Sequence, residues 1–546
     1  SACVAVAVNP NDDRYQRYVG KWIELPLFSR RVSILADEEV DPSFGTGVVM
    51  ICTFGDKTDV RWQKKYGLPI INAITENGLM TEENGRYKGM TMQECRASLV
   101  SDLKEQGLTE KSERIKQNAG TCWRCHTPVE ILSRQQWFMK TREMTEDVLK
   151  WTEKVLWVPS FSQRRMIDWA TSLDWDWVIS RQRIFGTPIP AWTCRKCGET
   201  VVAKREWLPV DPRFEKPAEG KCPKCGSIDL EGDSDVMDTW MDSSITCAVH
   251  AGWPDKDSFD QLFPADLQPN GLDIIRTWDY YLMVKHLALF GKAPYKTVLV
   301  NGMVRGSDGR MMHKSYGNYV DACDVLKKYG ADALRQWAAA GGVTGYDIPF
   351  RWSDIEYGRK FLTKLWNASR LVLISLSDYD PRSAFELESL DRWITSKLEN
   401  LTKKVTEAFD NYQFSVVIDV VRNFTWHSFC DQYLEAVKHR LYSSGPENER
   451  SRRAAQQTMA RVLLRVLQLL APICPHIVES IYERMRLPDK RHSVHELIWP
   501  TFDPQLINEK YEKEGDLLVA VISAIRRLKS EKGVSLKTPI KKLAIY

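Results

Sequence analysis

The spacing of hydrophobic and polar residues changes along the chain. Near the amino terminus, short apolar runs separated by Gly, Pro and Asp predict strands at 3–8, 31–35 and 47–52. Beyond Tyr346 the apolar residues recur at helical spacing over long stretches. The helices predicted there span 391–410, 414–442 and 451–485, with a further helix over 517–528. The chain is therefore predicted to pass from a β-rich part to a helical part.

An α/β segment is predicted between these two parts. Residues 270–290 place apolar side chains at helical spacing after a Pro-Asn-Gly turn, which predicts a helix with Asp273 in its first turn. The apolar run 298–304 predicts a strand. A crossover helix and the next parallel strand fit this interval, as in a Rossmann-like sheet. Taken alone, an acidic residue at a helix start is more often a cap or a partner of the helix dipole than a ligand-binding group.

Two Cys-x-x-Cys pairs carry the strongest chemical signal that rests on spacing alone. They are Cys194 with Cys197, and Cys222 with Cys225. Each pair is followed by Gly, and the spacing is typical of a four-thiolate zinc ribbon. The alternative, two chance pairs in a reduced core, fits poorly because Lys and Arg flank these cysteines. We predict a Zn²⁺-binding ribbon inserted at 191–235, whereas Cys122 and Cys125 have no partner pair and are predicted to form half of a site.

Residues 298–318 read VLVNGMVRGSDGRMMHKSYGN. A Gly-rich turn with one Lys is, by itself, more often an ordinary exposed loop. The stretch nevertheless resembles the Lys-Met-Ser-Lys-Ser loop of class I aminoacyl-tRNA synthetases, which folds over ATP. The resemblance implies that Lys314, with Arg310 as a neighbouring cation, stabilises charge that grows on the leaving pyrophosphate. Met311 and His313 depart from the family pattern, in place of the first Lys and the first Ser.

Two further segments resemble the synthetase core, WVISRQRIFGTPIPAW at 177–192 and DVMDTWMDSS at 235–244. By this correspondence the indole of Trp240 borders the amino-acid pocket, although a Trp is more often plain core. The carboxylate of Asp273 is implied to accept hydrogen bonds from the ATP ribose. The residues implied to bind ATP, which acts with Mg²⁺, are Gly271, Asp273, Gly302, Met303, Lys314 and Ser315.

Residues 41–69 resemble the editing insertion of the valine, isoleucine and leucine members of this family. The resemblance implies that Asp59 holds the α-amino group of a mischarged aminoacyl ester and that Asp56 accepts the threonine hydroxyl. A second pocket of this kind is needed because a site that admits valine cannot reject isosteric threonine by packing alone. The alternative interpretation is a pair of carboxylates that cap a loop.

The editing segment is most similar to the archaeal valine-type enzymes. The resemblance therefore implies activation of valine by ATP, transfer to tRNA(Val), and hydrolysis of mischarged threonyl-tRNA. Two alternatives are an isoleucine-specific enzyme and a non-catalytic or trans-acting tRNA-binding fragment of a split synthetase. No His-x-Gly-His, the other family motif, occurs in the sequence. We therefore expect the chain to be a piece of a longer protein.

The late helices resemble the anticodon-binding bundle of the same enzymes. The expected domains are a partial editing domain at 1–120, the second half of the catalytic core at 121–355, a connecting helical region at 356–390, the bundle at 391–505 and the start of a carboxyl-terminal region at 506–546. A basic cluster follows the last apolar helix face and consists of Arg526, Arg527, Lys529, Lys532 and Lys537. Such a cluster is usually only a solvated face, but a tRNA partner makes it the natural backbone contact.

Composition fits a multidomain enzyme. A chain of 546 residues with 43% hydrophobic residues is long enough for about three to four domains. The net charge of +4 is small, so RNA binding must depend on local basic patches. The remaining cysteines are scattered, which favours a reducing cytoplasm. No apolar stretch predicts a membrane span or a secretory signal, and we expect a monomer.

Overall fold

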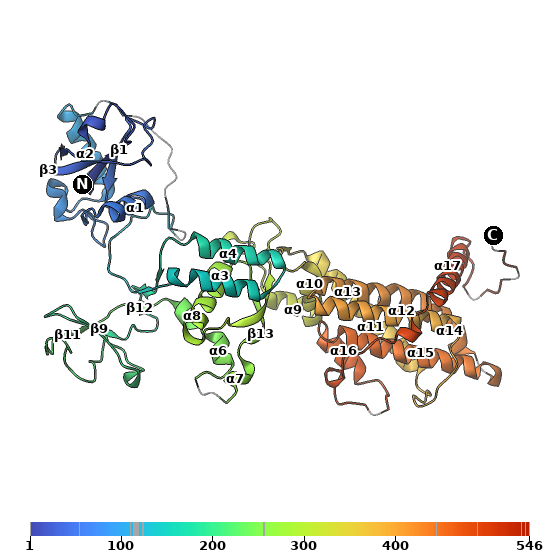
Figure 1. The fold of residues 1–546 in the computed structure, drawn as a ribbon. Coiled ribbons are helices and arrows are strands. Elements are labelled where there is room, and N and C mark those ends of the chain that lie inside the picture. The colour runs from blue at the N-terminus through green and yellow to red at the C-terminus, as the bar shows by residue number, and fades with distance from the viewer. Residues whose placement is uncertain are drawn as a thin grey trace. The chain divides into compact units, whose positions relative to one another are not determined.

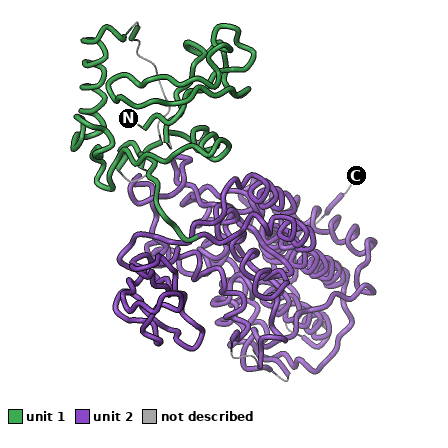
Figure 2. The backbone as a smooth tube through the Cα atoms, turned by 60° about the vertical axis from the view of Figure 1, so that its left-hand side comes forward, with its two compact units in different colours: residues 1–137 green, residues 138–546 purple. Residues whose placement is uncertain are grey.

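The protein is described here from a computed structural model. The described residues are 2–53, 55–109, 111–112, 120–122, 125–254, 257–443, 445–488, 490–536, 538–540 and 542–544. The chain forms two compact units, residues 1–137 and 138–546 (Figures 1 and 2). The five-domain division expected from the sequence stays a prediction. Among the described residues, no helix combines the length and the apolar character that crossing a membrane requires.

The first unit is built on a four-stranded sheet of order β2-β3-β1-β4. Its strands are β1 (Cys3–Val8), β2 (Trp22–Leu25), β3 (Arg30–Ala36) and β4 (Val48–Cys52). The central strand β1 is buried along its whole length, pairs parallel with β3 and antiparallel with β4, and packs against Trp62 of α1 (Lys57–Tyr66). Helix α2 (Met92–Glu105) begins with a Thr91–Glu94 capping box. The three predicted strands are confirmed, whereas β2, a strand of four residues that is largely exposed, was missed.

The second unit begins with a parallel sheet of order β13-β14-β6. Its strands are β6 (Leu156–Val158), β13 (Ala265–Gly271) and β14 (Tyr295–Asn301). Helix α8 (Tyr280–Phe290) is the crossover between β13 and β14, and its buried face packs with α3 (Thr145–Lys154) and α4 (Gln163–Ser172) around Val298 and Val300. A parallel crossover of this kind confirms the predicted α/β core.

Two predicted element boundaries in this core are wrong. Asn270 and Gly271 end strand β13, and the helical segment starts only at Ile275 as a π-helix (Ile275–Asp279), so Asp273 lies in the turn before the helix and not in its first turn. The predicted strand 298–304 is β14 up to Asn301, after which the chain turns and starts β15 (Val304–Arg305). Both boundaries are set by the pairing of β13 with β14, whose last pair is Gly271 with Asn301.

The zinc-ribbon segment forms its own antiparallel sheet of order β10-β9-β11. The strands are β9 (Ala191–Cys194), β10 (Thr200–Val202) and β11 (Leu230–Gly232). Trp192 is buried at its centre, and its indole Nε1 donates to the Glu215 carbonyl at 2.8 Å. This small core has few apolar side chains, so the cysteines make up much of it.

Long helices form the rest of the second unit, where α12, α13 and α15 run side by side (Figure 1). The α-helices are α9 (Ala322–Tyr329), α10 (Ala331–Gly341), α11 (Trp352–Ser375), α12 (Ser389–Asp410), α13 (Phe414–Asn423), α14 (Glu435–Tyr442), α15 (Pro446–Leu470), α16 (Pro475–Tyr482) and α17 (Glu509–Glu531). Residues 424–434 continue α13 into α14 as a π-helix, so the predicted helix 414–442 is confirmed in extent. The single helix predicted for 451–485 is wrong. The chain breaks at 471–474 and resumes at Pro475, because prolines 472 and 475 have no N–H for a continuing helix.

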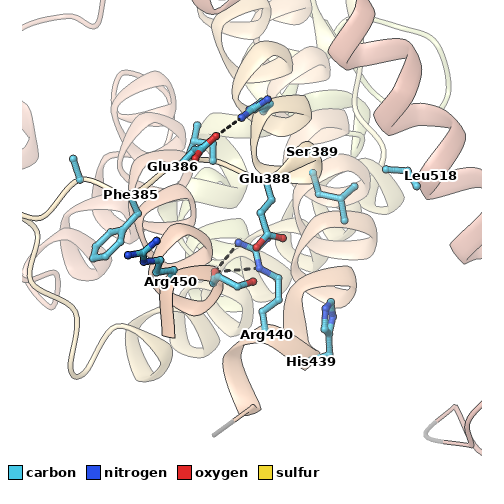
Figure 3. A pocket seen from close by; sticks show the side chains of 13 residues that line it. Phe385, Glu386, Glu388, Ser389, His439, Arg440, Arg450 and Leu518 are labelled. Carbon is cyan, nitrogen blue, oxygen red and sulfur yellow. Dashed lines mark hydrogen bonds and ion pairs between the residues drawn. The ribbon is translucent and has the colours of Figure 1, made fainter. Parts of the chain in front are cut away.

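A buried ion pair holds the bundle together at the start of α12. Both Nη atoms of Arg440 donate to the Asp391 carboxylate, at 3.0 and 2.8 Å, and the Tyr433 hydroxyl donates to it at 2.5 Å. Asp391 has no exposed surface. Arg440 and Glu388 line a cavity of about 920 Å³ that also touches Arg450 (Figure 3).

Candidate functional site

The predicted ATP-binding residues of the sheet lie at the carboxyl edge of two adjacent parallel strands. Gly271 ends β13 opposite Asn301 of β14, and the Leu272 amide donates to the Asn301 carbonyl at 2.8 Å. A Cβ on Gly302 would lie 1.8 Å from the Tyr346 carbonyl oxygen, so only Gly fits at this close approach. Asp273 is exposed in the following turn. Ligands of open α/β sheets bind at this edge.

The loop that follows is anchored at its base by Asp347. The Met303 amide donates to Asp347 Oδ1 at 2.9 Å, and Arg305 Nε donates to Asp347 Oδ2 at 2.7 Å. These contacts, the backbone N–H first and the guanidinium second, lower the pKa of Asp347. Strand β15 pairs in parallel with β16 (Ile348–Pro349) beside them. The loop therefore leaves the sheet from a fixed point.

We call residues 306–318 the signature loop. Asn318 closes it: its Nδ2 donates to Asp308 Oδ1 at 3.0 Å and to the Met311 carbonyl at 3.1 Å, and its Oδ1 accepts from the His313 amide at 2.9 Å. Arg310 Nε donates to Asp308 Oδ2 at 2.9 Å. The Asn318 amide, the Arg310 backbone N–H and the Arg310 guanidinium lower the pKa of Asp308 to about 2. Asp308 thus remains ionised and compensates the charge of Arg310.

Lys314 differs from Arg310 in having no such partner. It begins a short 3₁₀ turn (Lys314–Tyr316), its side chain is exposed, and its Nζ lies 5.4 Å from the centroid of the Tyr319 ring. No carboxylate among the described residues forms an ion pair with it. Of the two cations proposed from the sequence, Lys314 is therefore the one whose charge is free for a ligand.

His313 caps the turn that carries Lys314. Its Nδ1 accepts a hydrogen bond from the Ser315 amide at 3.3 Å, and the Ser315 hydroxyl lies 2.6 Å from the same atom. An amide N–H can only donate, so Nδ1 is an acceptor and the proton of the neutral ring is on Nε2. The Ser315 hydroxyl is then engaged with His313 and is not a free donor.

The two other synthetase-like segments contact each other. Strand β8 (Ser180–Arg181) pairs with β12 (Val236–Met237), and the Arg181 guanidinium forms an ion pair with Asp238. Asp238 also accepts from Trp177 Nε1 at 3.3 Å, while the Trp177 indole stacks on the Tyr281 ring of α8. Trp240 is half-buried in α5 (Thr239–Ser243), whose first turn Asp238 caps.

The four ribbon cysteines meet at one point. Their Sγ atoms all lie within 4.8 Å of one another, with the Sγ atoms of Cys194 and Cys225 3.6 Å apart and those of Cys197 and Cys222 3.7 Å apart. A tetrahedral ion with Zn–S bonds of about 2.3 Å needs S–S separations of roughly 3.8 Å. The geometry therefore fits a four-thiolate zinc site.

The described residues of the unpaired Cys-x-x-Cys turn, 122 and 125–127, share backbone features with the two ribbon turns. The Cys194 amide donates to the Glu199 carbonyl, the Cys222 amide to the Ser227 carbonyl and the Cys122 amide to the Thr127 carbonyl, at 2.8, 2.7 and 2.8 Å. In the third turn His126 takes the left-handed conformation, with φ of 59°, that glycines take in the first two. His126 thus takes the backbone position that glycine takes in the ribbon turns, and the described residues 122 and 125–127 have the hydrogen bonds of those turns.

The acidic pair proposed for editing occupies the start of α1. Asp56 Oδ1 accepts from the amides of Thr58 and Asp59 at 2.7 and 2.9 Å, which makes Asp56 the N-cap. Asp59 is 9% exposed, and burial, followed by the Asp56 charge, raises its pKa to about 6. A cavity of about 630 Å³, lined by Met50, Cys52 and Gly55 among others, adjoins them. The capping interpretation thus fits Asp56, whereas the Asp59 carboxyl is buried behind Gly55.

The sequence analysis missed the residues that hold the signature loop. Asp308, Asn318 and Asp347 define its shape, yet none was a candidate. The Gly-Asn dipeptide at 317–318 was a signal for Asn318, because Asn often bonds to nearby backbone in turns. Asp347 had no local signal, because its partners Met303 and Arg305 are distant in sequence.

Two family models match the chain. The model for tRNA synthetases class I (I, L, M and V) matches residues 39–351, and the model for the anticodon-binding domain of tRNA ligase matches residues 391–545. The chain belongs to the class I tRNA synthetases. This confirms the family expected from the signature loop, and the anticodon-binding match agrees with the predicted helical region.

The relatives include valine–tRNA ligases of archaea. The chain is 48% identical to that of Methanothermobacter thermautotrophicus over 546 residues and 46% identical to that of Archaeoglobus fulgidus over 547 residues. It matches along 100% of its own length but spans only 61% and 62% of theirs. This class I synthetase is thus similar in sequence to valine-specific enzymes over a part of their length.

Solved structures share the fold. A LeuRS–tRNA–LeuAMS ternary complex from Agrobacterium radiobacter K84 matches with a TM-score of 0.50 and 21% identity, over 93% of this chain and 60% of that one. Methionyl-tRNA synthetase of Mycobacterium tuberculosis with methionyl-adenylate matches with a TM-score of 0.52 and 18% identity, over 67% and 66%. At these sequence identities the two solved structures support the fold assignment alone.

Proposed function

We propose that this chain is part of a valine–tRNA ligase, which joins valine to tRNA(Val) with ATP and Mg²⁺. The observation that carries the proposal is the identity of 48% to a valine–tRNA ligase along the whole chain. Support from the geometry is that Gly271, Asp273 and Gly302 lie at or directly after the carboxyl ends of β13 and β14, and that the loop carrying Lys314 follows β14 along the chain. A nucleotide at this edge would lie beside the base of the loop that carries the Lys314 ammonium.

The proposed role of Lys314 follows from its free charge. Attack of the valine carboxylate on the α-phosphate expels pyrophosphate, and charge grows on the leaving oxygens. An unpaired ammonium on the loop stabilises that charge more than it stabilises bound ATP. Arg310 contributes less, because Asp308 already compensates it.

We assign one structural Zn²⁺ to Cys194, Cys197, Cys222 and Cys225. The closed set of four sulfurs leaves no position for substrate, so the ion stabilises the ribbon and takes no part in the reaction. For the editing reaction we propose that Asp59 holds the α-amino group of threonyl ester. Asp56 is a weaker candidate for the threonine hydroxyl, because its carboxylate already caps α1.

The test uses the complete open reading frame that contains this chain. We expect pyrophosphate exchange with valine that exceeds exchange with isoleucine or leucine, and charging of tRNA(Val). Exchange that depends on isoleucine instead identifies the alternative specificity. A full-length protein that binds tRNA(Val) but supports no exchange with any of the three amino acids contradicts a ligase. That result favours the second candidate, a non-catalytic tRNA-binding protein, which the Met311 substitution in the signature loop also favours.

A further inference from the structure

One face of the helical region holds its cations with aromatic rings instead of carboxylates. We call it the α9–α11–α16 face, after three helices that lie next to one another in the second unit (Figure 1). Its cations are Lys328, Arg359, Arg370 and Arg484, and its aromatic residues are Tyr329, Trp352 and Trp366. Helix α11 supplies most of these residues and falls between the two family matches, which end at 351 and resume at 391.

The rings fix the positions of three of these cations. Lys328 Nζ lies 5.1 Å from the Tyr329 ring centroid and 5.4 Å from that of Trp352. Arg359 Cζ lies 5.9 Å from the Tyr329 centroid, and Arg484 Cζ lies 5.5 Å from that of Trp366. A ring face attracts a cation through its quadrupole without cancelling the charge. The side chains are thus positioned while their charge stays available.

Carboxylates on this face do not compensate the charge. Among the described residues, Lys328, Arg359 and Arg370 form no ion pair, and the carboxylate paired with Arg484 is its neighbour Glu483 at 3.8 Å. Two other described acidic side chains line the hollows of this face. Glu356 pairs with Lys360 at 3.3 Å, and the buried Asp332 accepts hydrogen bonds from the His476 and Ile477 amides at the start of α16. A protein surface with this excess of fixed positive charge favours a polyanion as its partner.

The face also offers a ring for stacking. A hollow of about 420 Å³ is lined by Trp366, Arg370, Ile374 and Arg484. The Trp366 indole is 40% exposed although it borders an apolar wall. An exposed indole in a hollow that Arg370 and Arg484 also line suits an unstacked base with its phosphates, because proteins combine stacking with backbone contacts in this way.

The basic cluster that the sequence singled out on α17 has the opposite character. Arg526 Nη2 lies 3.0 Å from Glu435 Oε2, and Arg527 Nε lies 2.8 Å from Glu531 Oε1. Lys529 Nζ donates to the carbonyls of Leu536 and Thr538 at 3.0 and 2.6 Å. Lys537 lies outside the described residues. Two cations of the α17 cluster, Arg526 and Arg527, are therefore compensated by carboxylates within the protein, and the ammonium of Lys529 is engaged with backbone carbonyls.

We propose that the α9–α11–α16 face binds the sugar–phosphate backbone of tRNA, with one unstacked base against Trp366. The proposal rests on the proposed function for the identity of the RNA. It places the main phosphate contact on α11 and its neighbours and not on α17. Each phosphate that a cation neutralises adds roughly 0.7 to 0.9 to the slope of log K against log salt.

The test measures binding of the 546-residue chain to an archaeal tRNA(Val) transcript over a salt series. The triple variant Arg359→Ala/Arg370→Ala/Arg484→Ala is expected to lower the salt slope by about 2 to 3 and to weaken binding at least 10-fold at low salt. The matched control Arg526→Ala/Arg527→Ala removes two compensated cations and is expected to change the slope by less than about 1. Replacing the same three arginines with Lys is expected to retain the slope.

Trp366→Ala separates stacking from charge. It is expected to weaken binding about 5-fold or more with an unchanged slope, because the ring contributes no charge. The inference is overturned if the triple variant binds with the salt slope and affinity of the unchanged chain, which is the result expected for a face that serves a protein partner. It is also overturned if the α17 control loses as much salt slope and affinity as the triple variant. If the unchanged chain does not prefer tRNA over a DNA duplex of equal length, the proposed function fails as well.

Discussion

The raised pKa of Asp59 makes the stability of the first unit depend on pH in a direction opposite to that of most carboxyl groups. Burial, helped by the charge of Asp56, raises the pKa of Asp59 from the ordinary 3.8 to about 6. The native state therefore holds this proton more tightly than the unfolded chain does. Stability is greatest below the unfolded pKa, falls as the pH rises from about 4 to about 6, and is constant above that range.

The size of the effect follows from the two pKa values. The difference between 3.8 and about 6 corresponds to about 3 kcal/mol at full ionisation. Between pH 4 and pH 7.5 the change is about 2 to 3 kcal/mol, because at pH 4 part of the unfolded population is already ionised. The small exposure of Asp59, 9%, limits screening by solvent. We expect Asp59→Asn to remove this part of the pH dependence.

Hydrogen exchange of the β1 and β4 amides in the full chain measures the opening of this sheet. After correction for intrinsic rates, protection in the unchanged protein is expected to fall about 50-fold between pH 4 and pH 7.5 relative to Asp59→Asn. Asp56→Asn is the matched control, since Asn caps a helix as well as Asp but carries no charge. It should reduce the pH dependence without abolishing it. Equal pH dependence in the unchanged protein and in Asp59→Asn would refute the argument.

Three further outcomes test the other assignments. Lys314→Ala in the complete protein should lower valine-dependent pyrophosphate exchange by roughly 100-fold, and Arg310→Ala by clearly less; the reverse order would show that the active cation is Arg310. Metal analysis should find one zinc per chain, and the double variant Cys194→Ser/Cys222→Ser should lose it, whereas retained zinc would contradict the four-thiolate site. Asp391→Ala removes the bidentate partner of the buried Arg440 and leaves it only the more distant Glu388 carboxylate at 3.5 Å, so urea unfolding should show a loss of about 3 kcal/mol, and a loss below 1 kcal/mol would be too small for a buried pair.

Features set by local sequence were predictable. The two ribbon turns close through hydrogen bonds between residues five apart, so the Cys-x-x-Cys-Gly pattern contains nearly all the information that positions the four sulfurs. The same holds for helix 391–410, whose apolar period and length match α12 within two residues at its start. In both cases the chemistry or the period repeats within a few residues, and distant parts of the chain do not alter it.

Features set by distant pairing were not predictable. Apolar spacing over 270–290 continues upstream of Ile275, but the hydrogen bonds of β13 to β14 keep Gly271 extended. Likewise the apolar period of 451–485 continues across the break before Pro475, where missing N–H groups end α15. A period records which face of a segment is buried. It does not record where the backbone changes from one hydrogen-bonding pattern to another.

The signature loop shows the same limit at the level of charge. Arg310 and Lys314 are both cations in the Gly-rich signature loop, and the resemblance favoured Lys314 with Arg310 as a neighbouring cation. They differ because Asn318 fixes Asp308 beside Arg310, whereas Lys314, in the turn that His313 caps, forms no ion pair with a described carboxylate. Which cation is free depends on how the loop closes on itself, so motif matching names the candidates and the loop's hydrogen bonds select between them. The same distinction applies to α17 and the α9–α11–α16 face, because a count of basic residues does not separate cations paired with carboxylates, such as Arg526 and Arg527, from cations without such a partner.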